Sequence, residues 1–222
     1  MVRLARAVAI GYPHHVTQRG NYRQTVFETD TDYLQYLEWL KEYCEKYDVA
    51  LWAYCLMTNH VHFICVPERD DSLARTFNTL HMRYSQYVNR RRRVKGHLWQ
   101  GRFYSTILDE AHLYEAVRYV ETNPVRGGIV GEAEDYRWSS AREHVEGTSS
   151  GILSGDCYLV SQISSWRKYL GERVNERLRD EVRKCSLAGR PCGDETFIKR
   201  LERAFGRPLK ALPRGRPRKS EK

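Results

Sequence analysis

The chain has 222 residues, of which 41% are hydrophobic and 29% are charged, as expected of a water-soluble globular protein with one domain and an appendage or two small domains. Eighteen apolar residues never occur in succession, and the apolar patch near the N-terminus is too short for a signal peptide. These features exclude a membrane protein and favour an intracellular one. The six cysteines form no CxxC pair, which favours free thiols in a reducing compartment.

The net charge of +9 is unevenly distributed. Residues 183–222 contain 13 Lys and Arg against 4 Asp and Glu, whereas residues 1–182 contain 24 of each kind. Within that balanced part, residues 72–108 carry eight basic residues and no acidic one. Two such zones favour binding to phosphate backbones over a merely solubilising surface, because solubilising surfaces normally mix both signs.

The first predicted elements are a strand and a helix. Alternating residues from Val8 to Arg19 indicate the strand, which ends at the turn signal Gly20-Asn21. Asp30 or Thr31 can cap the helix. Its buried face is predicted from a spacing of three and four residues and comprises Tyr33, Leu37, Leu40, Cys44 and Tyr47.

A hairpin and a second helix are predicted next. Residues 49–57 are almost all apolar, which indicates a strand buried on both faces, and residues 60–66 form another strand after the turn Thr58-Asn59. Ser72 can cap the second helix, which ends in the run Arg90–Arg93. Its predicted buried face comprises Leu73, Phe77, Leu80, Tyr84 and Val88.

A short strand at residues 103–108 and a third helix, capped by Asp109 and finished before Pro124, complete the order β-α-β-β-α-β-α. The first six elements match the ferredoxin-like (split βαβ) sandwich, an α+β fold in which two helices cover one face of an antiparallel sheet. The third helix is therefore expected to cover the open face.

The C-terminal part is predicted to be mostly helical. The segment GTSSGILSG at residues 147–155 indicates a loop, so we divide the chain into a domain at 1–146, a helical extension at 147–210 and a disordered basic tail at 211–222. Amphipathic helices are expected at residues 166–183 and 194–205, the second capped by Asp194.

Two histidines in the motif Asn59-His60-Val61-His62-Phe63 could bind a metal ion. His60 and His62 are two apart on a strand, so both side chains project from the same face. Two imidazoles on a stiff strand suit a divalent cation. A purely structural pair is the alternative, because short HxH motifs are common.

The third helix carries a polar stripe beside its apolar one, and this stripe comprises His112, Glu115, Tyr119 and Asn123. Over the open sheet face, Tyr119 would lie beside the histidine pair, with Asn123 able to supply an oxygen ligand. A packing tyrosine followed by an Asn-Pro helix stop is the alternative. A metal that polarises a scissile phosphate would let a phenol attack it, leaving a DNA 5′-phosphate on Tyr119 and a free 3′-hydroxyl.

Three separated segments carry a resemblance to a known family. The histidine pair is similar to the histidine–hydrophobic–histidine signature of HUH endonucleases. The segments LMTNHVHFICVP (56–67), LWQGRFYS (98–105) and YVETNPVRGG (119–128) together resemble the REP-associated tyrosine transposases of bacteria, which are single-tyrosine HUH transposases. The likeness runs from about Tyr12 to about Arg142 and makes residues 1–146 the catalytic domain.

The resemblance implies that His60, His62 and Asn123 bind Mg²⁺ or Mn²⁺ and that Tyr119 is the nucleophile that attacks single-stranded DNA. Other tyrosines in the chain are rivals, but only Tyr119 has an Asn four residues later. Three positions depart from the family pattern or vary within it, and they bear on which DNA sequence is read: Gly101 stands where many relatives have a basic residue, and Glu121 and Thr122 occupy variable positions.

The implied substrate is a DNA hairpin with single-stranded flanks, typically a repetitive extragenic palindrome, and the implied location is the cytoplasm of a bacterium, in association with its nucleoid. Side chains of the acid-free stretch could hold the backbone and stack unpaired bases, although a solvated basic helix end is the alternative. These DNA-binding candidates are Arg83, Arg90, Arg91, Arg92, Arg93, Lys95, Trp99 and Arg102.

The tail segment PRGRPRK at residues 213–219 is similar to an AT-hook, whose arginines, here Arg214 and Arg216, enter the minor groove of AT-rich duplex DNA. Plain electrostatic anchoring is the alternative. The sequence as a whole predicts a metal-dependent single-strand DNA endonuclease and strand-transferase, with a monomer favoured over a homodimer. The rival hypothesis is a non-catalytic hairpin-binding or regulatory protein derived from such a transposase.

Overall fold

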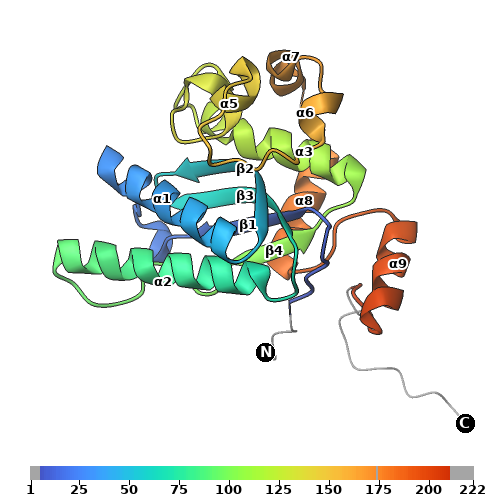
Figure 1. Cartoon of the computed structure of the whole chain (residues 1–222), viewed down its shortest axis with the longest axis horizontal. Helices are drawn as coiled ribbons and strands as arrows, with labels where there is room; N and C mark the ends of the chain where they lie inside the picture. The colour runs from blue at the N-terminus through green and yellow to red at the C-terminus, as the bar shows by residue number, and fades with distance from the viewer. Residues whose placement is uncertain (1–5, 174, 211–222) are drawn as a thin grey trace, which may run out of the picture.

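A four-stranded antiparallel sheet lies at the centre of the chain (Figure 1). Its strands are β1 (His14–Arg19), β2 (Val49–Met57), β3 (His60–Pro67) and β4 (Tyr104–Ile107), and their spatial order is β2-β3-β1-β4. This order is that of the ferredoxin-like sandwich, so the predicted α+β fold class is confirmed. The computed structural model describes residues 6–173 and 175–210.

The first strand is shorter than predicted. It begins at His14, because Gly11 turns the chain with a φ of +74° and Pro13 has no N–H to donate to a neighbouring strand. The hairpin of β2 and β3 is confirmed, with Val49 opposite Pro67 and Met57 opposite His60.

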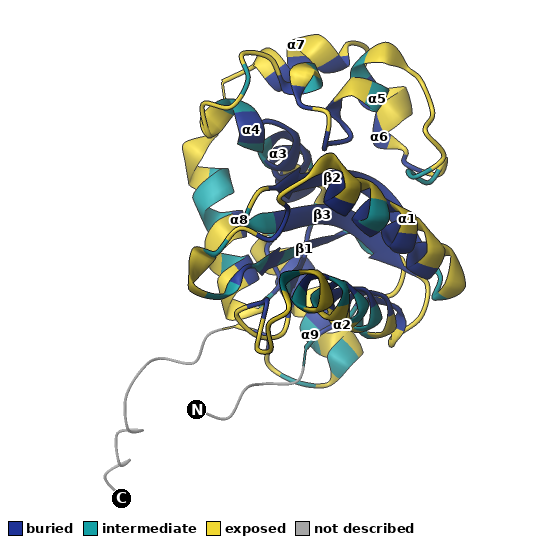
Figure 2. Cartoon of the chain, turned by 90° about the vertical axis from the view of Figure 1, so that its left-hand side faces the viewer, coloured by how far each residue is buried: buried dark blue, intermediate teal, exposed yellow. Residues whose placement is uncertain are grey.

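Two long helices, α1 (Asp30–Lys46) and α2 (Ser72–Arg92), cover one face of the sheet (Figures 1 and 2). Each begins at the residue expected to cap it, so the true caps are Thr29 and Asp71. At α1 the reason is a capping box, in which the Asp32 carboxylate accepts the backbone N–H of Thr29 at 3.0 Å. The predicted apolar faces of both helices are buried, except that Tyr47 is half-buried.

The opposite face is covered by α3 (Glu110–Glu121) and α8 (Glu176–Ala188) (Figures 1 and 2). Asp109 caps α3 as predicted, by accepting the backbone N–H of His112 at 2.9 Å. Helical backbone resumes at once in the short α4 (Asn123–Arg126), because a proline is tolerated in a first helical turn. Strand β2 is therefore buried along its whole length between two layers.

The extension packs on the first domain. The helix expected at 166–183 is instead two helices, α7 (Trp166–Gly171) and α8, because the Asn175 side chain caps a new helix by accepting the N–H of Leu178 at 3.2 Å. Helix α9 (Glu195–Phe205) has the predicted cap, Asp194. The remaining short helical segments are η1 (Asn21–Arg23), η2 (Ala133–Asp135), α5 (Ala141–Glu146) and α6 (Leu159–Gln162).

Buried side chains of the extension, such as Leu159, Trp166 and Val182, belong to the same apolar cluster as the core of residues 1–146. All six cysteines are free thiols. Within the described ranges no helix has the length and apolar character needed to cross a membrane.

Candidate active site

The histidine pair lies on the face of β3 that α3 covers. His62 is buried and His60 half-buried, and their ring centroids are 5.0 Å apart. The intervening Val61 and the following Phe63 are fully buried toward the other face, where Phe63 packs against Phe77 of α2. The strand alternation therefore separates the two polar rings from the aromatic core.

Tyr119 meets this pair from α3. Its ring centroid lies 5.3 Å from that of His62, with the two rings nearly perpendicular. The Arg126 guanidinium lies over the tyrosine ring, 4.9 Å from its centroid. Asn123 opens α4 one turn after Tyr119, and in the part of the chain that the structure describes its buried Nδ2 atom has no hydrogen-bond partner. Tyr119 and His62 are 57 positions apart in the chain, and the packing of α3 on β3 brings the phenol and the imidazoles together.

A third histidine, His15 of β1, also belongs to the site. Its ring stacks on that of His62 at 5.1 Å, and its Nε2 lies 2.9 Å from Nδ1 of His62. Its other nitrogen lies 2.7 Å from Oγ of Ser186 in α8. Neither His15 nor Ser186 was predicted from the sequence as part of the site. The alternation of β1 was visible, but the pairing of Thr17 with His62, which sets His15 beside it, exists only in the folded sheet.

The imidazoles of the site are held in the neutral form. Burial lowers the pKa of His15 to about 4, and burial together with Arg19 lowers the pKa of His60 to about 4. Burial also lowers the pKa of His62 well below its usual value, and its histidine and arginine neighbours lower it further. Neutral imidazoles have a free lone pair, which a metal ion requires.

Positive charge surrounds these rings. Arg19 of β1 and Arg126 of α4 both act electrostatically on His62, and Arg183 of α8 lies close enough to lower the pKa of Arg19. Within residues 6–173 and 175–210, no ion pair joins any of the three to a carboxylate. Arginines without a carboxylate partner beside the Tyr119 ring favour an anionic ligand such as a phosphodiester.

The end of the tyrosine helix is anchored by a buried carboxylate. Glu121 is fully buried, and one of its oxygens accepts from Ser140 Oγ and from Nδ1 of His144, the latter at 2.6 Å. Burial lowers the pKa of His144, but the charge and hydrogen bond of Glu121 outweigh it and raise the pKa above its usual value. A position that the sequence analysis treated as variable therefore holds the helix in place.

The remaining polar residues of the α3 stripe are occupied elsewhere. His112 contacts Asp109 at 2.6 Å and Glu181 of α8 at 3.1 Å. Glu115 forms an ion pair with Arg118 in the same helix. His112 links α3 to α8, and Glu115 also accepts the backbone N–H of Asn175, which caps α8, at 3.2 Å. The half of the stripe that faces the histidine pair is therefore its C-terminal half.

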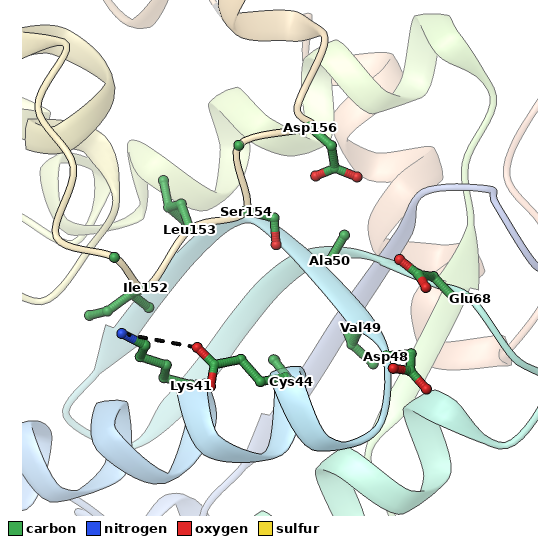
Figure 3. Close-up of a pocket in the computed structure, with 13 residues that line it drawn as sticks. Lys41, Cys44, Asp48, Val49, Ala50, Glu68, Ile152, Leu153, Ser154 and Asp156 are labelled. Carbon is green, nitrogen blue, oxygen red and sulfur yellow. Dashed lines mark ion pairs between the residues drawn. The ribbon is translucent and has the colours of Figure 1, made fainter.

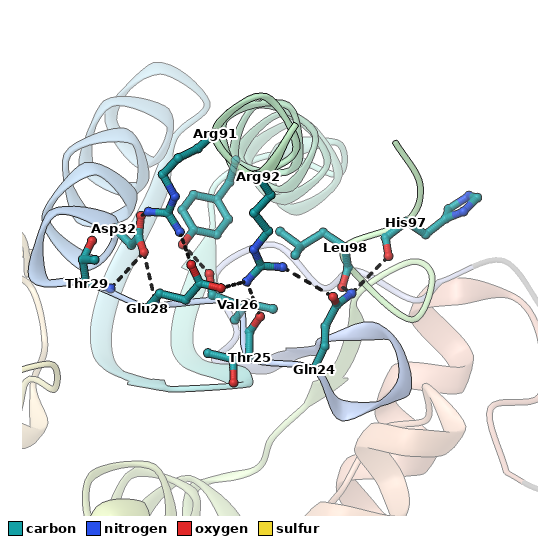
Figure 4. A network of polar contacts seen from close by, with 11 residues as sticks. Gln24, Thr25, Val26, Glu28, Thr29, Asp32, Arg91, Arg92, His97 and Leu98 are labelled. Carbon is teal, nitrogen blue, oxygen red and sulfur yellow. Dashed lines mark hydrogen bonds and ion pairs between the residues drawn. The ribbon is translucent and has the colours of Figure 1, made fainter. Parts of the chain in front are cut away.

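The predicted DNA-binding residues fall into two groups. Figure 4 shows Arg91 paired with Glu28 and Asp32, and Arg92 paired with Glu28. Arg83 pairs with Glu42 across α1 and α2, and Trp99 is buried, with its Nε1 donating to the carbonyl oxygen of His81 at 3.3 Å. The exposed group, which has no ion pair within the described ranges, comprises Arg90, Arg93, Lys95 and Arg102. Arg214 and Arg216 lie outside the described residues.

A cavity beside the start of β2 has the opposite character. It lies between the C-terminal end of α1 and residues 151–156, as Figure 3 shows, and Glu45, Asp48, Glu68 and Asp156 contribute to its lining. Four carboxylates against the single Lys41 would repel a phosphate backbone. The histidine face is therefore the better candidate for chemistry on DNA.

Known proteins match the chain across this site. Residues 10–123, which span the histidine pair, Tyr119 and Asn123, match the family model described as "Transposase IS200 like". A Haemophilus influenzae protein named "Putative REP-associated tyrosine transposase" is 27% identical over 153 residues, which cover 61% of this chain and 87% of that protein.

The structure of a REP-associated tyrosine transposase bound to a REP hairpin is similar in fold, with a TM-score of 0.56 at 21% identity over 78% of this chain and 99% of that one. These comparisons confirm the resemblance drawn from the sequence. Because the family model matches just over half of the residues and includes every residue of the proposed catalytic set, the chain belongs to the IS200-like transposase family.

Proposed function

We propose that this protein is a metal-dependent transposase that cleaves single-stranded DNA next to a hairpin and holds the cleaved end on Tyr119. The observation that carries the proposal is the contact of the Tyr119 ring with His62, whose buried Nε2 atom has no hydrogen-bond partner among residues 6–173 and 175–210. A buried polar atom left unpaired is costly, so a ligand is the natural explanation for one beside a nucleophile.

The residues present fit Mg²⁺ or Mn²⁺. Asn59 Oδ1 holds Nδ1 of His60 at 2.6 Å and His15 holds Nδ1 of His62, so Nε2 of each ring remains for a cation. Among the described residues no three His, Cys, Asp or Glu side chains are grouped to hold a metal ion. The set we propose is therefore two imidazoles and the amide of Asn123, completed by oxygens of the substrate. A divalent cation bound there would polarise the scissile phosphate.

The chain's own residues supply the nucleophile and the electrostatics. Arg19 and Arg126 attract the phosphodiester to the ring of Tyr119. The tyrosine oxygen forms a bond to phosphorus and loses its proton, while the bond from phosphorus to the 3′ oxygen breaks and that oxygen gains a proton. The product is a 5′-phosphotyrosine and a 3′-hydroxyl. The phosphotyrosine bond can then be attacked by another 3′-hydroxyl, which transfers the strand.

The proposed substrate is a DNA hairpin, as named for the related structure, and we propose that it carries single-stranded flanks. Exposed arginines on and after α2, Arg90 and Arg93, are available for its backbone. The tail, with Arg214 and Arg216, is proposed to contact AT-rich duplex. A monomer suffices for the reaction, because Tyr119 and His62 of the same chain are in contact.

The test is incubation of the protein with a 5′- and 3′-labelled hairpin oligonucleotide and Mn²⁺, followed by denaturing electrophoresis. We expect a covalent adduct that carries the label 3′ of the cut, that disappears in Tyr119→Phe and that persists in Tyr114→Phe, a control on the same helix. An adduct that survives in Tyr119→Phe would refute the assignment. Hairpin binding with no adduct in the wild type would instead support a non-catalytic hairpin-binding protein.

A further inference from the structure

A continuous line of hydrogen bonds runs from the C-terminal extension to His62. The hydroxyl of Ser186 donates to the carbonyl oxygen of Val182, one turn earlier in α8, at 2.8 Å. Ser186 Oγ is 2.7 Å from Nδ1 of His15, and Nε2 of His15 is 2.9 Å from Nδ1 of His62. Ser186, His15 and His62 are all at most 4% exposed, so water does not compete for these bonds.

The serine sets the direction of the line. Its one hydrogen goes to Val182, so Oγ accepts the hydrogen on Nδ1 of His15. A neutral His15 protonated at Nδ1 has its lone pair at Nε2, which accepts the hydrogen on Nδ1 of His62. His62 is then left with a lone pair at Nε2, the atom for which the described residues offer no hydrogen-bond partner.

The reverse direction is unfavourable. If Ser186 donated to His15 instead, each ring would change tautomer and His62 would carry its hydrogen on Nε2. That hydrogen would be buried with no acceptor among the described residues, and it would block the position where a cation could bind.

We propose that Ser186 and His15 are positioning residues that hold His62 in the tautomer protonated at Nδ1, so that its Nε2 lone pair is available to the cation. The role of the cation in this inference rests on the proposed function. The tautomer of His62 does not, because it follows from the hydrogen bonds alone. It gives α8 a part in the site, because a residue 124 positions after His62 determines which of its nitrogens is free.

The first test observes the tautomer in metal-free protein. Long-range ¹H–¹⁵N correlation spectra of protein labelled with ¹⁵N-histidine distinguish protonated from unprotonated ring nitrogens. We expect His62 to be protonated at Nδ1 in the wild type and in Ser186→Thr, which keeps the hydroxyl, and to populate both tautomers in Ser186→Ala. Ser85→Ala is the matched control, because Ser85 makes the same bond to the carbonyl oxygen of His81 in α2, on the other side of the sheet. A wild-type His62 protonated at Nε2 would overturn the proposal.

The second test measures Mn²⁺ affinity by calorimetry without DNA. We expect Ser186→Ala to weaken binding about 10-fold and His15→Phe, which keeps a stacked ring but no nitrogen, to weaken it about 100-fold. Ser186→Thr and Ser85→Ala should bind as the wild type does. Equal affinity in all variants would overturn the proposal that Ser186 and His15 position His62. Normal Mn²⁺ binding with no covalent adduct on DNA would refute the proposed function without contradicting this positioning role.

Discussion

Two buried histidines near the end of α3 are built in opposite ways. His62 is surrounded by imidazoles and arginines, so burial and positive neighbours lower its pKa well below the usual value. His144 lies against the buried Glu121, which raises its pKa despite burial. Burial alone therefore does not decide the charge of a histidine, because the partner decides whether desolvation or attraction prevails.

The two environments serve two purposes. A neutral imidazole with a free nitrogen suits a ligand, as proposed for His62. An imidazole whose pKa is raised by a buried carboxylate suits an anchor, and the His144 ring also stacks on Trp166 of α7 with centroids 4.1 Å apart. Tyr119 stands two positions before Glu121, so the anchor holds the segment that presents the proposed nucleophile.

The largest effect is expected on the rate of DNA cleavage when His62 is replaced. His62→Ala should reduce the rate of covalent adduct formation at least about 100-fold, since it removes a proposed ligand. The effect on stability should be smaller, because His62 loses only its hydrogen bond with His15, and its Nε2 atom has no hydrogen-bond partner among the described residues. Single-turnover assays with Mn²⁺ and urea unfolding measure the two effects. If this variant cleaves as fast as the wild type, His62 is not a ligand, and its proposed difference in role from His144 is refuted.

The second effect is expected in stability. Glu121→Ala removes one partner of a buried pair and should lower the free energy of unfolding by about 3 kcal/mol. The control is Glu42→Ala, whose exposed pair with Arg83 should contribute less than about 1 kcal/mol. Urea unfolding at pH 6 compares them. A similar loss in both variants would show that Glu121 is no more of an anchor than a surface residue.

The third effect is the pH dependence of the stability that His144 contributes. Because the pKa of His144 is raised in the folded state, the stability it contributes is present below the unfolded pKa of about 6.5 and is lost as pH rises through the folded pKa. The stability difference between the wild type and Glu121→Gln should therefore shrink above pH 6.5, by up to about 1.4 kcal/mol per pH unit. A difference that grows with pH would contradict a charged His144.

Buried histidines without a carboxylate should behave in the opposite sense. Burial lowers the pKa of His14 to about 4 and that of His81 to about 3. Their stabilising contribution is present above pH 6.5 and is lost as pH falls toward those values, by up to about 1.4 kcal/mol per histidine and pH unit. Urea unfolding between pH 7 and 5 should show this decline, and His81→Phe should make it shallower.

The smallest effect concerns two neighbouring arginines, whose roles should also differ according to whether a carboxylate pairs with them. Arg90 is exposed and unpaired within the described ranges, whereas Arg91 is paired with the buried Asp32. Arg90→Ala should lower the slope of hairpin affinity against salt concentration by about 0.7 to 0.9, the contribution of one phosphate contact. Arg91→Ala should leave that slope unchanged and lower stability instead. Binding titrations at several salt concentrations measure the slope, and equal slopes in both variants would contradict the division.

Periodicity determined much of this protein from the sequence alone. The alternation of β3 sets His60 and His62 on one face, and the helical spacing of Tyr119 and Asn123 sets them one turn apart, because both patterns depend only on backbone geometry. The same local rule predicted the buried faces of α1 and α2. It did not find the break at Asn175, where a side-chain cap starts a new helix inside an amphipathic pattern.

The tertiary structure decided which residues contact each histidine of the site and its anchor. His15 and Ser186 are 171 positions apart, and Glu121 and His144 are 23 apart, so no local spacing relates them. Sheet register and the packing of α8 bring the first pair together, and the segment after α4 brings the second. Hydrogen bonds and ion pairs set the tautomer and charge of each ring, so the chemistry of these histidines depends on contacts that form only when the chain folds.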